Sequence, residues 1–212
     1  MSGEGDYTAG VQAESNGHRD YLGAKFGMWL FLFTEVLLFG GMFLVYSVFR
    51  SRFPLDFHNA AAELNVTLGA VNTLVLLTSS LSMAAAITAM QKGGARLSLY
   101  LQGATVFLAG VFLLNKYFEW GAKISHGLYP GSEHMAELPH GEILFYSLYY
   151  VMTGLHGLHV IIGLAAILFI MRFTVNGVVN SGDYIKLENT GLYWHLVDLV
   201  WIYLFPLFYL IT

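Results

Sequence analysis

Long blocks of apolar residues, rather than short alternating runs, dominate the hydrophobic pattern of this chain. A helix needs about 20 apolar residues to cross the hydrocarbon of a membrane, whereas a membrane β-barrel shows short alternating segments. The pattern therefore predicts an all-α integral membrane bundle of five transmembrane helices. The predicted spans are Phe26–Phe49, Val66–Met90, Leu97–Phe118, Ile143–Met171 and Gly191–Ile211.

The segments outside these spans are short. Residues 1–22 are polar and lack the basic start and apolar core of a signal peptide, so we expect a polar N-terminal tail. The longest connection, residues 119–142, is too short to form a second domain. Residues 23–212 are therefore expected to form a single five-helix transmembrane domain.

Basic residues near the span ends predict the orientation, because cytoplasmic flanks carry an excess of lysine and arginine. This excess places the N-terminus inside and the C-terminus outside. The richer side carries Arg19, Lys25, Lys92, Arg96, Arg172 and Lys186, and the poorer side carries Arg50, Arg52 and Lys123.

Composition agrees with a membrane protein and excludes several kinds of site. Hydrophobic residues make up 56% of the chain and charged residues 11%, whereas a soluble domain carries about 25% charged residues. The absence of cysteine excludes disulfides, cysteine-ligated zinc, iron–sulfur clusters and thiolate-bridged copper. The net charge of −4 is scattered, so no nucleic-acid partner is expected.

Glu35 is the clearest polar residue inside a predicted span. It follows the start of the first span by nine residues, about 14 Å at 1.5 Å per residue, which is near the membrane midplane. A carboxyl group there is costly and needs a reason. It is either a buried group bonded to a neighbouring helix or a proton or ligand site.

The fourth span carries two histidines at helical spacing. His156 and His159 share one face of the fourth span, where Gly154 and Gly157 would permit a close helix approach. We interpret these histidines as hydrogen-bonding groups across a helix contact, and a metal or haem ligand pair is the alternative.

Two pairs of polar residues occur at the same spacing of three. His195 and Asp198, in the last span, could orient a metal ligand, but we favour a buried pair that joins helices. Lys116 and Glu119 lie at the end of the third span, where we expect an interfacial anchor with a weak ion pair. All six of these histidine, acid and lysine positions are thus predicted to be structural.

Several motifs, taken together, resemble one known family. TGLHGLHVIIG, followed by YWHLVDLVW, is similar to the signature of cytochrome c oxidase subunit III. KFGMWLFLFTEV resembles the family helix that bears a buried glutamate, and NTLVLLTSSLS and KYFEW follow the family pattern in order and spacing. The resemblance runs from Lys25 to the end of the chain and fits the short, five-helix form of the family.

The resemblance implies a supporting role without redox chemistry. Such a subunit would carry no catalytic residue, metal or cofactor, with haem and copper in partner subunits. It would pack against catalytic subunit I and other oxidase subunits, hold phospholipid and support proton uptake, in a bacterial inner membrane. The resemblance also implies lipid-binding roles for Lys25, Gly27, Glu35 and Arg172.

Three alternatives remain at this point. The chain could serve a quinol oxidase or a nitric oxide reductase rather than a cytochrome c oxidase. It could be a b-type cytochrome, although His159 lies about 18 Å and His195 about 6 Å into the membrane, too different for one haem. It could also be a proton-coupled transporter with Glu35 and Asp198 as relay acids, although no internal repeat is evident.

Overall fold

A computed structural model describes residues 21–211, and these residues are almost entirely helical. The described elements are α2 (Tyr21–Arg52), α3 (Pro54–Ala62), α4 (Val66–Gln91), α5 (Ala95–Ser125), α6 (Glu133–Ala136), α7 (His140–Val175) and α8 (Ile185–Tyr209).

Five of these helices, α2, α4, α5, α7 and α8, are long and apolar enough to cross a membrane. The prediction of an all-α bundle with five transmembrane helices is therefore confirmed. Most of the helices run past the predicted ends. The 36 residues of α7 extend about 54 Å, well beyond about 30 Å of hydrocarbon. Residues 1–20 of the expected tail lie outside the described residues, whereas Tyr21 and Leu22 belong to α2.

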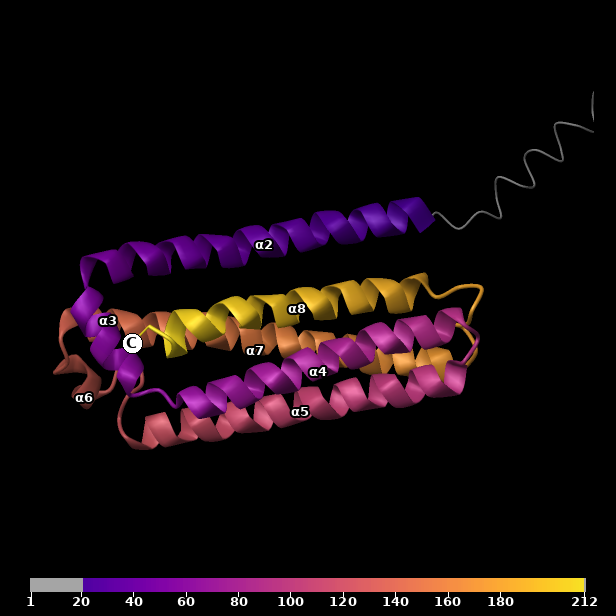
Figure 1. Cartoon of the computed structure of the whole chain (residues 1–212). Helices are drawn as coiled ribbons and strands as arrows, with labels where there is room; N and C mark the ends of the chain where they lie inside the picture. Colours follow the sequence, from indigo (N-terminus) through magenta and orange to yellow (C-terminus); the bar gives the residue numbers. More distant parts are fainter. Residues whose placement is uncertain (1–20, 212) are drawn as a thin grey trace, which may run out of the picture.

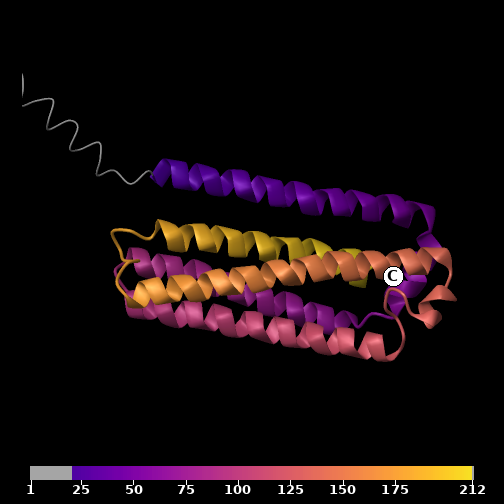
Figure 2. The same ribbon diagram turned by 180° about the vertical axis from the view of Figure 1, so that it is seen from behind.

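Four of the long helices, α4, α5, α7 and α8, form a compact bundle, and α2 lies along one side of it next to α8 and α7 (Figure 1). The view from behind shows α7 crossing the length of the bundle below α2 (Figure 2). Only Leu32, Phe39 and Tyr46 of α2 are buried, and these are spaced by seven residues. The helix thus touches the bundle along one stripe and leaves most of its apolar surface exposed.

The short helices α3 and α6 cover one end of the bundle, where α2 ends and α7 begins (Figure 1). The sequence analysis did not predict α3. Its signal is Pro54 at the first helical position, where a missing N–H costs nothing. Phe57 of α3 is fully buried and packs edge-to-face on Tyr46 and Phe145, so α3 seals this end of the core.

Glycines allow close contacts along α7. A Cβ atom on Gly163 would lie 2.8 Å from the ring of Trp194, and one on Gly154 would lie 3.1 Å from the ring of Trp120. The close approach expected at Gly154 therefore occurs. At Gly157 no atom of the described residues lies within 4 Å of where a Cβ would be, so the close approach expected there does not occur within residues 21–211.

Candidate functional site

Glu35 of α2 and His159 of α7 form a hydrogen-bonded pair. The Glu35 Oε2 and His159 Nε2 atoms lie 2.9 Å apart, and both side chains are largely buried. The other ring nitrogen of His159, Nδ1, lies 2.8 Å from the backbone carbonyl oxygen of Leu155. Because a carbonyl oxygen only accepts hydrogen bonds, Nδ1 carries a hydrogen and Nε2 faces the carboxyl group.

This geometry leaves one proton to share between Nε2 and the Glu35 carboxyl group. The proton lies either on nitrogen, as an imidazolium–carboxylate pair, or on oxygen, as a neutral pair, and neither form has a net charge. Phe39 packs against the His159 ring at 5.1 Å between centroids, and Tyr193 donates a hydrogen bond to the His159 carbonyl at 3.3 Å. The pair therefore joins α2 to α7 through a hydrogen bond between two largely buried side chains.

His156 differs from its neighbour one turn away. Its side chain is 1% exposed, and within residues 21–211 neither ring nitrogen has a hydrogen-bond partner. The ring lies edge-on to Phe112 at 5.6 Å and against Trp201 at 5.3 Å. The hydrogen bond expected across a helix contact is thus present at His159 but absent at His156 in this part of the chain. A buried imidazole normally has hydrogen-bond partners, so the His156 ring stands out in being packed against aromatic rings instead.

His195 and Asp198 both face α4 rather than each other. His195 Nδ1 lies 2.6 Å from the hydroxyl oxygen of Ser80, and this contact joins α8 to α4. Ser80 also hydrogen-bonds to the Asp198 carboxyl group, which is buried. The sequence did not identify Ser80 as the group that connects them, since 115 residues separate it from His195.

Lys116 and Glu119 lie inside the bundle rather than at its surface. Both are 8% exposed, and Lys116 Nζ lies 3.0 Å from Glu119 Oε2. Tyr149 and Tyr209 donate hydrogen bonds to Glu119 Oε1 at 2.7 and 2.5 Å, and Lys116 Nζ contacts both hydroxyl oxygens. The expected ion pair is thus present, and two tyrosines from α7 and α8 enclose it on the inner face of α5. We call these four residues the Lys116 cluster.

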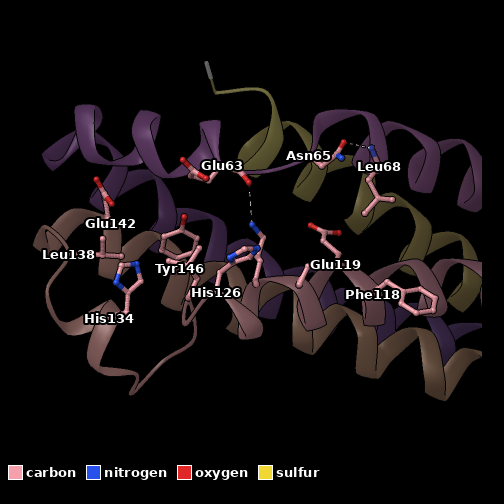
Figure 3. A pocket seen from close by; sticks show the side chains of 13 residues that line it. Glu63, Asn65, Leu68, Phe118, Glu119, His126, His134, Leu138, Glu142 and Tyr146 are labelled. Carbon is pink, nitrogen blue, oxygen red and sulfur yellow. Dashed lines mark hydrogen bonds between the residues drawn. The ribbon is translucent and has the colours of Figure 1, made fainter.

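A pocket of about 720 Å³ opens beside the Lys116 cluster, at the end covered by α3 and α6. The carboxyl groups of Glu63, Glu119 and Glu142 surround this space together with Tyr146 (Figure 3). Lys123, also in the lining, is buried, and its Nζ donates to the Glu63 backbone carbonyl at 3.4 Å. The pocket therefore connects a buried ion pair with the aqueous end of the bundle.

The remaining candidate residues lie at the opposite end of the bundle, where α2 begins and α7 ends. Lys25 forms an ion pair of 3.1 Å with Glu188 of α8 beside a second pocket of about 270 Å³. Arg172 is exposed, and Gly27 has no atom within 4 Å of where a Cβ would lie. The described interactions do not include a contact between any two of Lys25, Gly27 and Arg172.

The sequence analysis missed Tyr146, Tyr149 and Thr153. A signal was available, because these polar residues precede His156 and His159 at spacings of three and four along α7. All five residues are at most 9% exposed, and their spacing places them on one buried face of α7. Tyrosine and threonine are also common packing residues of membrane helices, so these three residues were not predicted as site residues.

Comparison with known proteins links this arrangement to one family. The family description of cytochrome c oxidase subunit III matches residues 9–212. Cytochrome c oxidase subunit 3 of Synechocystis sp. is 34% identical over 97% of this chain and 82% of the relative. The cytochrome bo(3) ubiquinol oxidase subunit 3 of Buchnera aphidicola is 30% identical over 87% of this chain and 92% of the relative. A haem–copper oxidase subunit I+III of Aeropyrum pernix is 31% identical over 87% of this chain and 22% of the relative.

Proposed function

The chain belongs to the cytochrome c oxidase subunit III family and is a subunit III of a haem–copper oxidase in the bacterial plasma membrane, and from this premise we propose that it supports catalysis without carrying a catalytic centre. It would stabilise the catalytic subunit, hold phospholipid and help to sustain proton uptake during turnover. Relatives named for cytochrome c and for ubiquinol both match the chain, and the proposed role is common to both.

The exposed apolar surface of α2 is the observation that carries this proposal. A membrane helix buried along a single stripe presents its remaining surface to lipid or to another chain. The Aeropyrum relative, by its name, joins subunits I and III in one polypeptide, which favours catalytic subunit I as a direct partner. The α2 side would then face the catalytic subunit, other oxidase subunits or ordered lipid.

Lipid binding would use residues at the start of α2 and the end of α7, together with Glu35 farther along α2. Lys25, Gly27 and Arg172 would contact a head group, since a basic residue near an anionic membrane contributes about 1 kcal/mol. The open space at Gly27 and the pocket beside Lys25 support this assignment. Glu35, deeper in the same helix, would border the acyl region.

The histidine geometry supports placing haem and copper in partner subunits. His159 uses both ring nitrogens within the chain, so it has none free for a metal. His195 uses Nδ1 to reach Ser80, and the ring of His156 is enclosed by Phe112 and Trp201.

Purification through a tag on this chain in mild detergent tests the proposal. We expect a reduced-minus-oxidised spectrum of haem from a larger partner subunit, which disappears when that partner is stripped away. A stripped chain that keeps its haem would show that the histidines are ligands. Purification without any haem protein would contradict the proposed assembly.

A further inference from the structure

A groove of about 340 Å³ lies between α2 and α8, and we call it the α2–α8 groove. Each helix lines it with residues three, four and seven positions apart, which is the spacing of one helix face. The residues from α2 are Trp29, Leu32, Phe33 and Val36, and those from α8 are Leu192, His195, Leu196 and Leu199. Because His195 is the one imidazole in an otherwise apolar lining, the groove is suited to an apolar molecule with a single polar group.

The α2–α8 groove begins near the charged end of the bundle and reaches into the membrane. Lys25 of α2 and Glu188 of α8 form an ion pair of 3.1 Å close to the starts of both helices. Trp29 follows Lys25 by four residues, or about 6 Å, and His195 follows Glu188 by seven, or about 10 Å. A ligand that reaches His195 therefore places its polar group at hydrocarbon depth, where an unpaired donor or acceptor is costly.

The hydrogen bonds of Ser80 determine what the second ring nitrogen of His195 can bind. Ser80 has one hydroxyl hydrogen, and it donates this hydrogen to the carboxyl group of Asp198. Its oxygen, 2.6 Å from His195 Nδ1, therefore accepts a hydrogen bond from Nδ1. His195 Nε2 then carries a lone pair and has no hydrogen-bond partner within residues 21–211. A ligand in the groove must offer a hydrogen-bond donor to satisfy this nitrogen.

The lining disfavours the two parts of an ordinary phospholipid. A phospholipid head group is charged, and the described lining residues offer it no charged partner, so its burial there would be costly. A fatty acyl chain has no hydrogen-bond donor, so it would leave His195 Nε2 unpaired. The ligand that fits is therefore a largely apolar molecule with a hydroxyl group.

Two aromatic side chains of α2 favour a ring over a flexible alcohol. Trp29 and Phe33 lie one turn apart in the groove lining and are 61% and 58% exposed. Aromatic side chains pack well against other aromatic rings, in offset-stacked or edge-to-face arrangements. A hydroxylated aromatic ring between the two helices would contact these side chains and His195 at the same time.

We propose that the α2–α8 groove binds the head of a prenylated benzoquinol, with one ring hydroxyl donating a hydrogen bond to His195 Nε2. The ring lies against Trp29 and Phe33, and the prenyl chain leaves past Val36 and Leu199 toward the middle of the membrane. Binding involves no electron transfer and no covalent step. The corresponding benzoquinone has carbonyl oxygens in place of the hydroxyl groups, so it cannot donate to Nε2 and binds more weakly.

A benzoquinol whose decyl chain ends in a diazirine tests this site. The oxidase complex, purified through a tag on this chain in mild detergent, is incubated with the probe without oxygen and irradiated. Peptide mass spectrometry then separates label on this chain from label on partner subunits. We expect label on α2 and α8 near Val36 and Leu199. Unlabelled decyl benzoquinol should displace it at concentrations at least about tenfold lower than decyl benzoquinone, as expected for one hydrogen bond.

Three outcomes would overturn the proposal. They are label confined to partner subunits, displacement by decanol as readily as by the benzoquinol, and displacement by the benzoquinone as readily as by the benzoquinol. Purification without a haem protein would instead contradict the assembly proposed above, so the two failures are distinguishable.

Two variants separate recognition by His195 from apolar packing. His195→Leu keeps an apolar side chain in the lining but removes the acceptor, so we expect at least about tenfold less label. Ser80→Ala removes the acceptor for Nδ1, which allows the hydrogen of the imidazole to move to Nε2. The preference for benzoquinol over benzoquinone is then expected to disappear. Unchanged label in His195→Leu would show that the groove does not recognise the hydroxyl group.

Thr78→Val is the matched control for Ser80→Ala. Thr78 is an exposed residue of the same helix, and its hydroxyl donates to the Leu74 carbonyl at 2.7 Å. Label and preference should both stay as in the unaltered complex. Labelling and displacement in the unaltered complex decide the proposal even where a variant fails to assemble.

Discussion

At the residue scale, the Glu35–His159 pair shows how one contact can anchor a loosely packed helix. Glu35→Ala leaves His159 Nε2 without its partner in a largely buried position. An unsatisfied buried group costs about 1–3 kcal/mol, so we expect earlier thermal unfolding of the complex and a shorter active lifetime during turnover. Glu35→Gln, which keeps a hydrogen-bonding group at this position, should lie closer to the unaltered protein. Equal thermal stability of Glu35→Ala and the unaltered protein would contradict this role of the pair.

The Lys116 cluster allows a second prediction at the same scale. Lys116→Met leaves the Glu119 carboxylate buried with only hydroxyl partners, and breaking a buried ion pair in this way costs about 3–5 kcal/mol. The double variant Lys116→Met with Glu119→Gln removes both charges and should be less destabilised than the single one. Thermal unfolding of the four members of this cycle measures the coupling. Additive effects in that cycle would mean that the two side chains act independently.

Residue positions could be predicted from the sequence more readily than residue partners. The spacing identified Glu35, His156, His159 and His195 as buried polar groups, because charged and polar side chains are conspicuous in apolar spans. The partners could not be predicted, since Glu35 and His159 are 124 residues apart and their contact depends on how α2 packs. The burial of Lys116 could not be predicted for the same reason, since the tyrosines that contact it come from other helices.

At the scale of the element, two glycines of α7 should respond in opposite ways to the same substitution. Gly163→Ala places a methyl group 2.8 Å from the ring of Trp194, which is fully buried and held by a hydrogen bond to Ser79. Overpacking of this kind costs about 1–3 kcal/mol. Gly157→Ala meets no atom within 4 Å and should be neutral or stabilise the helix by about 0.5–1 kcal/mol. The order of thermal unfolding temperatures tests this, and a greater loss in Gly157→Ala would contradict the packing of α7 on α8.

Helix existence was predictable from hydrophobicity, but helix ends and short helices were not. The second span begins at Val66 as predicted, because Asn65 accepts a hydrogen bond from Leu68 and caps the helix there. The third was predicted to end at Phe118, yet α5 continues to Ser125, since Glu119 and Lys123 turn inward toward the bundle. Hydrophobicity locates the membrane-crossing part of a helix, whereas these extensions and α3 depend on contacts outside the hydrocarbon.

At the scale of the whole molecule, the distribution of lysine and arginine predicts that the α3–α6 end faces outside. The sequence contains no cysteine, so a single introduced cysteine can be labelled without background. Ala136→Cys lies on the exposed surface of α6, and Ser181→Cys lies in the exposed connection between α7 and α8 at the other end. A membrane-impermeant maleimide should label Ala136→Cys in intact cells and Ser181→Cys only after permeabilisation.

The outcome of this labelling determines which aqueous phase the pocket beside the Lys116 cluster faces. With the predicted orientation, this pocket would open to the outer aqueous phase, on the side opposite to the basic flanks of Lys25 and Arg172. The reverse labelling pattern would overturn the orientation and place the pocket on the cytoplasmic side. Because both cysteines are exposed positions outside the Glu35–His159 pair and the Lys116 cluster, the measurement leaves these contacts intact. It therefore also decides which leaflet supplies the head groups that Lys25 and Arg172 would contact.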